Sequence, residues 1–185
     1  TPSYDGGNDI VVNENGDVYV AGWSHGSLVD GTGGSAQDLA VLKYDSSGNR
    51  LWARQLEDPI SAPAGIAIDA SSNVYLAGET HNTSISGDPS DLILLKYDGE
   101  NGSLEWTQRL GTNQKDVGED VTVDSNGNIY VIGQTSGSFN ALNDNLGNAG
   151  ARDFFVAKYD DTGILQWIQQ LGTSCCHFKL WTSLQ

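Results

Sequence analysis

The feature that most constrains this sequence is an internal repeat that occurs three times. Each copy contains three motifs in the same order. The first is an apolar run that contains a tyrosine and ends on glycine, the second begins with Asp and ends in Lys-Tyr-Asp, and the third contains a tryptophan. The equivalent residues are Tyr19, Tyr75 and Tyr130 in the first motif, Lys43, Lys96 and Lys158 in the second, and Trp52, Trp106 and Trp167 in the third. Successive tyrosines are 56 and 55 positions apart. This recurrence indicates a repeat architecture in which each copy is one structural unit.

Each copy is expected to form four β-strands and no helix. The first is a short run that is apolar at successive positions, as in 10–12, which is typical of a strand covered on both faces. Asn-Gly then favours a tight hairpin because both residues tolerate positive φ. The second strand ends on Gly22, Gly78 or Gly133, where we expect a neighbouring group to approach closely. The Lys-Tyr-Asp strand, a second glycine turn and the tryptophan strand complete the unit.

Four antiparallel strands per unit predict an all-β fold of β-propeller blades, with three four-stranded antiparallel repeats. We place repeat 1 at 1–56, repeat 2 at 57–110 and repeat 3 at 111–173. Residues 174–185 match nothing earlier and contain the only cysteines, Cys175 and Cys176. We interpret the stretch Cys175 to Gln185 as a foreign or frame-shifted tail, with an assembly strap as the alternative.

The motifs resemble the bacterial β-propeller repeat known as SBBP. Its copies read roughly Ile-Ala-Val-Asp-Ser-Ser-Gly-Asn-Val-Tyr-Val-Thr-Gly, followed by Phe-Val-Ala-Lys-hydrophobe-Asp and a Leu-Trp strand ending near Leu-Gly. Residues 155–160 and 171–172 match this pattern closely, and the resemblance extends over 1 to about 173. It implies the propeller fold. It implies no particular activity, because propellers host many unrelated functions. We separately predict a secreted or cell-surface bacterial protein.

Complete propellers typically carry about 4–8 blades, so three blades form only a partial ring. The apolar faces of the first and last blades would then stay exposed, and such patches mark interaction sites. We therefore expect either a truncated propeller or a homo-oligomer. The homo-oligomer would be a closed ring of two copies, or a filament if the rotation does not close.

Charge excludes several partners. The chain has 9 basic and 24 acidic residues, a formal net charge of −15. Nucleic-acid binding draws on clustered Lys and Arg, so no nucleic-acid partner is expected. No apolar run is long enough to span a bilayer, which predicts no membrane insertion.

Recurrence separates structural residues from candidate functional ones. The lysines of the second motif, its leading aspartates and the tryptophans occur in every copy, so we assign them to blade structure. Calcium is the one candidate metal, and no other cofactor is expected. Asp9 and Asp120, at equivalent strand entries, are expected near the end of the central channel. The turn with Asp124, Asn126 and Asn128 offers oxygen ligands at alternate positions, as calcium prefers. The full calcium-hand pattern is missing, and Asx-turn chemistry is the alternative.

Ligand recognition is expected in the loop between the second and third strands, whose length varies between copies. Its third copy, which contains Phe139, Asn143, Asp144 and Asn145, is the preferred ligand loop, with a glycan or a protein as the ligand.

We therefore predict a non-catalytic extracellular binding and assembly module that self-associates through its exposed blade faces and recognises ligand with variable loops. No nucleophile is positioned beside His25 or His81, and no phosphate-binding loop occurs. The alternative is a fragment of a secreted polysaccharide-acting hydrolase or lyase, because paired carboxylates are abundant.

Overall fold

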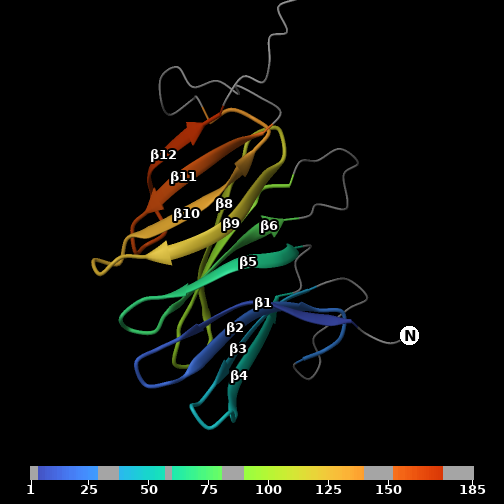
Figure 1. The fold of residues 1–185 in the computed structure, drawn as a ribbon, viewed down its shortest axis with the longest axis vertical. Helices are drawn as coiled ribbons and strands as arrows, with labels where there is room; N and C mark the ends of the chain where they lie inside the picture. Colours follow the sequence, from blue (N-terminus) through green and yellow to red (C-terminus); the bar gives the residue numbers. More distant parts are fainter. Residues whose placement is uncertain (1–3, 29–37, 57–59, 81–89, 140–151, 173–185) are drawn as a thin grey trace, which may run out of the picture.

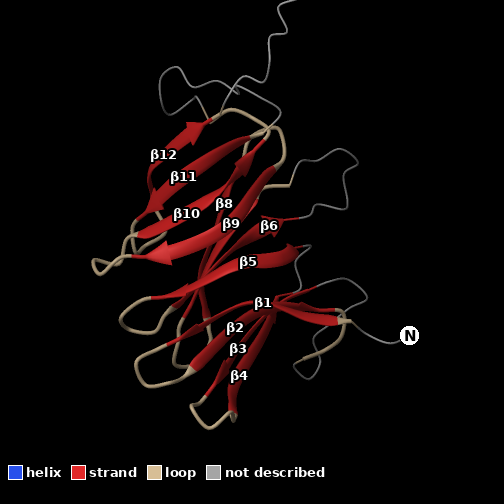
Figure 2. Cartoon of the chain, viewed as in Figure 1, coloured by secondary structure: helices blue, strands red, loops and turns tan. Residues whose placement is uncertain are grey.

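A computed structural model describes residues 4–28, 38–56, 60–80, 90–139 and 152–172. Every regular element in these ranges is a strand (Figure 2). The first unit holds β1 (Asp5–Val12), β2 (Val18–Ser24), β3 (Asp38–Tyr44) and β4 (Arg50–Leu56). The second holds β5 (Ile60–Ile68), β6 (Val74–Thr80), β7 (Leu92–Tyr97) and β8 (Leu104–Leu110). The third holds β9 (Asp116–Val123), β10 (Ile129–Thr135), β11 (Asp153–Tyr159) and β12 (Leu165–Leu171). Within the described ranges, no helix is long and apolar enough to cross a membrane.

The strands form three separate four-stranded sheets, ordered β1-β2-β3-β4, β5-β6-β7-β8 and β9-β10-β11-β12. All neighbours are antiparallel, so each sheet is a meander of successive hairpins. The sheets are stacked face to face along the long axis of the molecule, from β1–β4 at one end to β9–β12 at the other (Figure 1). This is the predicted all-β arrangement of three propeller blades. We call the sheets blades 1, 2 and 3.

Two hydrophobic cores lie between consecutive blades. The core between blades 1 and 2 includes Tyr19, Val41 and Leu76, and the core between blades 2 and 3 includes Leu94 and Phe155, all fully buried. Full burial of such a side chain contributes roughly 1.5–3 kcal/mol. A single blade has no core of its own, because its apolar groups are buried only against the next blade.

The first strand of each blade is longer than predicted. β1 begins at Asp5, not at Ile10, and its pairing with β2 is shifted between Gly7 and Asp9. Equivalent shifts occur before Gly65 and Asp120. An extra residue at such a bulge interrupts the alternation of side chains between the two faces. The residues before the bulge therefore do not show the pattern from which a strand is predicted.

The predicted coverage of the first strand is also wrong for β1. Ile10 and Val12 are 60% and 55% exposed, whereas Ile66 of β5 and Val121 of β9 are 6% and 5% exposed. The strand is apolar on both faces in every repeat, but blade 1 has no described neighbour on its outer face.

Gly22 and Gly133 lie at points of close approach, as predicted, but they do not end the second strand, because β2 and β10 continue to Ser24 and Thr135. A methyl group on Gly22 would overlap the carbonyl oxygen of Gly6, and one on Gly133 would overlap that of Val117. The hairpin turns differ from the prediction in one respect: Gly16 and Gly127 have φ of 82° and 80°, while the asparagines before them do not have positive φ. Each turn is instead closed by the glycine N–H, which donates to a carbonyl three residues earlier.

Candidate functional site

The most regular feature of the molecule is a Tyr-Lys-Trp unit on the same face of each blade. The tyrosine and tryptophan ring centroids lie 6.1 Å apart in blade 1, 6.1 Å in blade 2 and 6.2 Å in blade 3. The lysine ammonium lies 5.1, 5.7 and 5.5 Å from the tyrosine ring centroid in the same order. The three tryptophans and lysines are therefore parts of one repeated packing unit, as their recurrence predicts.

In blade 1 this unit receives a backbone carbonyl of blade 2. Lys43 Nζ donates to the carbonyl oxygen of Gly99 at 3.0 Å, and Trp52 Nε1 and the Tyr19 hydroxyl reach the same oxygen at 3.4 Å. Lys43 also forms an ion pair with Asp17 at 3.1 Å. Burial opposes the charged ammonium, but the hydrogen bonds that the ammonium donates to Tyr19 and Asp17 outweigh it and hold the pKa of Lys43 above its usual value.

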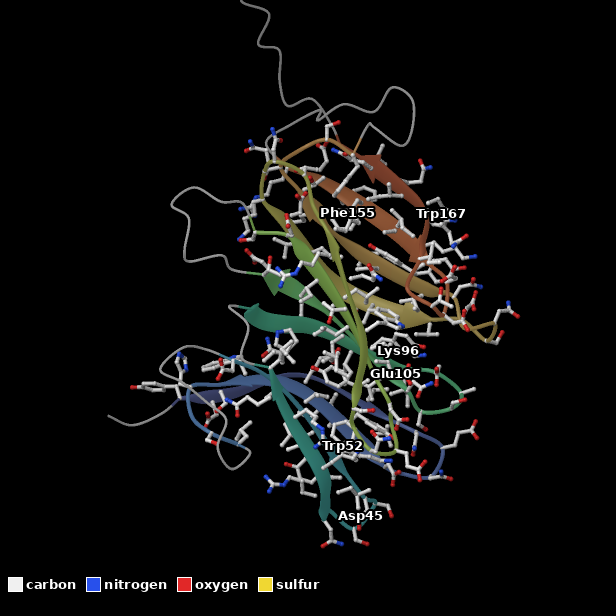
Figure 3. The ribbon with its side chains drawn as sticks, turned by 180° about the vertical axis from the view of Figure 1, so that it is seen from behind. Asp45, Trp52, Lys96, Glu105, Phe155 and Trp167 are labelled. Carbon is white, nitrogen blue, oxygen red and sulfur yellow. The ribbon has the colours of Figure 1, made fainter. Side chains whose placement is uncertain are left out.

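Blade 2 uses the same unit with other polar partners. Lys96 forms an ion pair with Glu105 at 2.9 Å, and the two side chains are adjacent in Figure 3. The Tyr75 hydroxyl donates to Asp69 at 3.1 Å. Burial raises the pKa of Tyr75 well above its usual value, and the Asp69 carboxylate adds to the effect. The aromatic geometry is therefore kept while the polar contacts vary.

A second repeated contact joins each blade to the next. The turn between the third and fourth strands of the following blade lies against the tryptophan ring of the preceding blade. A Cβ on Gly102 would lie 2.8 Å from Trp52, and one on Gly163 would lie 3.2 Å from Trp106. Arg54 strengthens the first contact because its Nε donates to the Gly102 carbonyl at 2.8 Å. This contact was not predicted from the sequence, although glycine precedes tryptophan by the same four positions in all three copies.

The outer faces of blades 1 and 3 carry residues equivalent to those of the internal interfaces, but no described neighbour covers them. On blade 1, the exposed face includes Ile10 and Val12. It also has a shallow, mainly apolar hollow of about 250 Å³, whose lining includes Gly7, Val20, Gly22, Ala40 and Leu42. On blade 3, Ile132 and Phe154 are 46% and 53% exposed, whereas the equivalent Ala77 and Leu92 of blade 2 are 1% and 0% exposed. Each end of the stack therefore presents one half of a blade-to-blade interface.

The predicted calcium residues are found in backbone-supporting roles. Asp124 Oδ1 accepts the N–H groups of Asn126 and Asn128 at 2.8 and 2.9 Å, and its Oδ2 accepts the Asn128 amide and the Tyr130 hydroxyl. The hydrogen bond from the Asn128 side chain is the main cause of a lowered Asp124 pKa, ahead of the two backbone N–H groups. This is the Asx-turn alternative that the sequence left open.

Asp9 and Asp120 occupy equivalent positions on β1 and β9, on either side of β5. Asp9 accepts the N–H of Ile10 and, across the blades, that of Ile66 at 3.0 Å. Asp120 accepts the N–H of Val121 at 2.8 Å and lies against Gly65. No cluster of three or more His, Cys, Asp or Glu side chains suited to a metal ion occurs among the described residues. Calcium binding remains a prediction.

The predicted ligand loop is described only in part. Phe139 is 8% exposed and packs edge-on against Phe155 with ring centroids 5.3 Å apart, so it is a core residue and not a surface contact. Its N–H donates to Gln170 at 2.9 Å. Asn143, Asp144 and Asn145 lie outside the described residues, as do Cys175 and the rest of the tail.

Comparisons with known proteins agree with this geometry. The SBBP family model, described as a β-propeller repeat, matches residues 51–86 and 105–140. The crystal structure of quinohemoprotein alcohol dehydrogenase from Comamonas testosteroni superposes with a TM-score of 0.51 at 15% identity, covering 91% of this chain and 36% of that one. The molecule is therefore a β-propeller repeat domain. The stretches 51–86 and 105–140 are similar to the SBBP repeat.

Two curated proteins are similar in sequence. An uncharacterized WD repeat-containing protein of Acanthamoeba polyphaga mimivirus is 25% identical over 169 residues, which is 76% of this chain and 12% of that protein. The regulatory protein FlaEY of Caulobacter vibrioides is 32% identical over 110 residues, which is 53% of this chain and 11% of that protein. The chain thus spans about an eighth or less of the length of these relatives.

Proposed function

We propose that this chain is a non-catalytic, extracellular β-propeller module that self-associates through its two outer blade faces and recognises a glycan or protein ligand with its variable loops. The observation that carries the proposal is that equivalent residues of the three blades differ in exposure to solvent. Ile10 is 60% exposed on blade 1, while its counterparts Ile66 and Val121 are almost completely buried. Apolar side chains whose equivalents are buried between blades are thus exposed to solvent at both ends of the stack.

The two outer faces are complementary in kind. Both internal interfaces bring the Tyr-Lys-Trp face of one blade against the opposite face of the next. Among the described residues, no neighbour covers the Tyr-Lys-Trp face of blade 3 or the opposite face of blade 1. A head-to-tail contact between two copies would repeat the internal interface and bury both apolar patches. Two such contacts would close a ring of six blades, which lies within the usual range of roughly 4–8.

The loops supply the second part of the proposal. The loops between the second and third strands differ in length on a common blade scaffold, which is where recognition residues concentrate. An acidic surface with a net charge of −15 favours a neutral or cationic ligand over an anionic one.

Light scattering over a range of protein concentrations tests the self-association. We expect a mass of about twice 19.7 kDa for a closed ring, or a mass that grows with concentration for a filament. A monomer of 19.7 kDa at every concentration, with one sharp unfolding transition, would contradict the proposal.

A further inference from the structure

No turn in the described ranges covers the tryptophan of blade 3, whereas the other two tryptophans each have one. Trp167 is 39% exposed, compared with 8% for Trp52. The Tyr130 ring and the Lys158 ammonium are nevertheless held beside it in the same arrangement as in blades 1 and 2. The platform is therefore preformed before anything binds to it.

Among the described residues, no tryptophan lies against the glycine turn of blade 1. Gly102 and Gly163 are buried against the rings of Trp52 and Trp106. Gly48, at the equivalent position, is exposed, and no described atom lies within 4 Å of its Cβ position. Its φ of 84° matches the 73° and 83° of Gly102 and Gly163, so the turn already has the conformation found in the two internal contacts.

Trp167 and the Gly48 turn cannot contact each other within one chain. Asp45, at the start of the Gly48 turn, lies at the far tip of blade 1, and Trp167 lies on blade 3 at the opposite end of the stack (Figure 3). Blade 2 separates the two blades, and both of its faces are already covered.

We infer that Trp167 is the docking site for the 45–49 turn of a second copy of this chain, with Gly48 of that copy placed against the indole ring. The inference rests on the proposed self-association and names the contact that sets its register. Each internal contact of this kind pairs a glycine with positive φ and a tryptophan. Gln169 on β12 holds the position from which Arg54 donates to the Gly102 carbonyl, and its amide can donate to the corresponding carbonyl of the second copy.

The second copy is favoured as the occupant by the repeat itself. The face of blade 3 is equivalent to two faces that each receive a blade with this turn, and blade 1 carries the turn and an uncovered opposite face. The only blade with this turn free among the described residues is blade 1, so the matching surface belongs to another molecule of the same chain.

Two pairs of variants test the contact on its two sides. Trp167→Ala is compared with Leu104→Ala, because Leu104 is 42% exposed and lies on the outer strand of blade 2, whose faces are covered. Gly48→Ala is compared with Gly127→Ala, because both glycines have φ near +80° but Gly127 lies in a hairpin of blade 3. Leu104→Ala also removes an exposed apolar side chain, and Gly127→Ala introduces a similar backbone strain.

The measurement is the association constant of each purified variant from sedimentation equilibrium, with thermal unfolding to compare the folds. We expect Trp167→Ala and Gly48→Ala to weaken association about thirtyfold or more, as loss of a central aromatic anchor does. Leu104→Ala and Gly127→Ala should associate as the unsubstituted chain does. If the unsubstituted chain is monomeric, the proposed function fails and this inference fails with it. If it associates but both test variants match their controls, the self-association stands and the Trp167 contact is refuted.

Discussion

At the scale of single residues, aspartates close the tight turns of the blades. Asp45, Asp69, Asp124 and Asp160 each accept, at one carboxylate oxygen, the N–H groups two and four residues further along the chain. Asn13 makes the same two contacts in blade 1 with its side-chain oxygen. The repeated acidic residues therefore support backbone turns, and asparagine can replace aspartate in this role.

Acid should destabilise the fold through these turns. Hydrogen bonds donated to the carboxylate lower the pKa of Asp45, Asp124 and Asp160. The largest contribution comes from the side chain of Asn49 for Asp45, of Asn128 for Asp124 and of Thr162 for Asp160. A lowered folded-state pKa gives stability that is present above the unfolded pKa of about 3.9 and is lost as the pH falls through the folded value. Denaturant titrations between pH 7 and pH 2 should show this loss below about pH 4.

The control for acid destabilisation is Asp124→Asn, which keeps the turn as Asn13 does but removes one titrating group. Its stability should fall less steeply with acid than that of the unsubstituted chain. Identical pH profiles for the two proteins would refute a role of the Asp124 carboxylate in this pH dependence.

At the scale of elements, a blade buries its apolar side chains against a neighbouring blade. Leu92 on β7 and Phe154 on β11 occupy the same position of the repeat, yet Leu92 is 0% and Phe154 53% exposed. The difference arises from the neighbour and not from the strand itself. The same holds for Trp106 and Trp167, which share a strand position but not a covering turn.

Truncation of these two equivalent residues should have unequal effects on the isolated stack. Leu92→Ala should lower the free energy of unfolding by about 2–5 kcal/mol, because it leaves a cavity between blades 2 and 3. Phe154→Ala should cost less than about 1 kcal/mol in dilute solution, where its face is solvated. Denaturant unfolding at low protein concentration measures both values. Equal losses would show that the outer face of blade 3 is covered within the chain.

The fold was largely predictable from the sequence, and the contacts between blades were not. The recurrence of Tyr19, Lys43 and Trp52 in every copy predicts strands and blades, because equal units must fold alike. The carbonyl of Gly99 and the covering of Trp52 by Gly102 belong to a neighbouring blade, and backbone carbonyls leave no signal in side-chain patterns. Phe139 was assigned to a ligand loop because it follows the second strand, but its ring packs into the core against Phe155.

At the scale of the whole molecule, the chain is a stack of three blades with two unlike ends. One end presents the turn of Gly48 and the apolar face around Ile10, and the other presents the Trp167 platform and Phe154. Under the proposed self-association, two unlike ends would meet head to tail, and such a contact would close into a ring or grow into a filament. The internal interfaces supply the geometry that such a contact repeats.

Mixing two variants with opposite ends blocked tests this claim most directly. Ile10→Asp blocks the face of blade 1, and Phe154→Asp blocks the face of blade 3; both positions are more than half exposed, so each variant should still fold. By light scattering, each variant alone should have the 19.7 kDa mass of a monomer. An equimolar mixture should form a dimer of about twice 19.7 kDa that grows no further, because one intact contact remains. A mixture that stays monomeric while the unsubstituted chain associates, or one variant that associates alone, would contradict head-to-tail assembly.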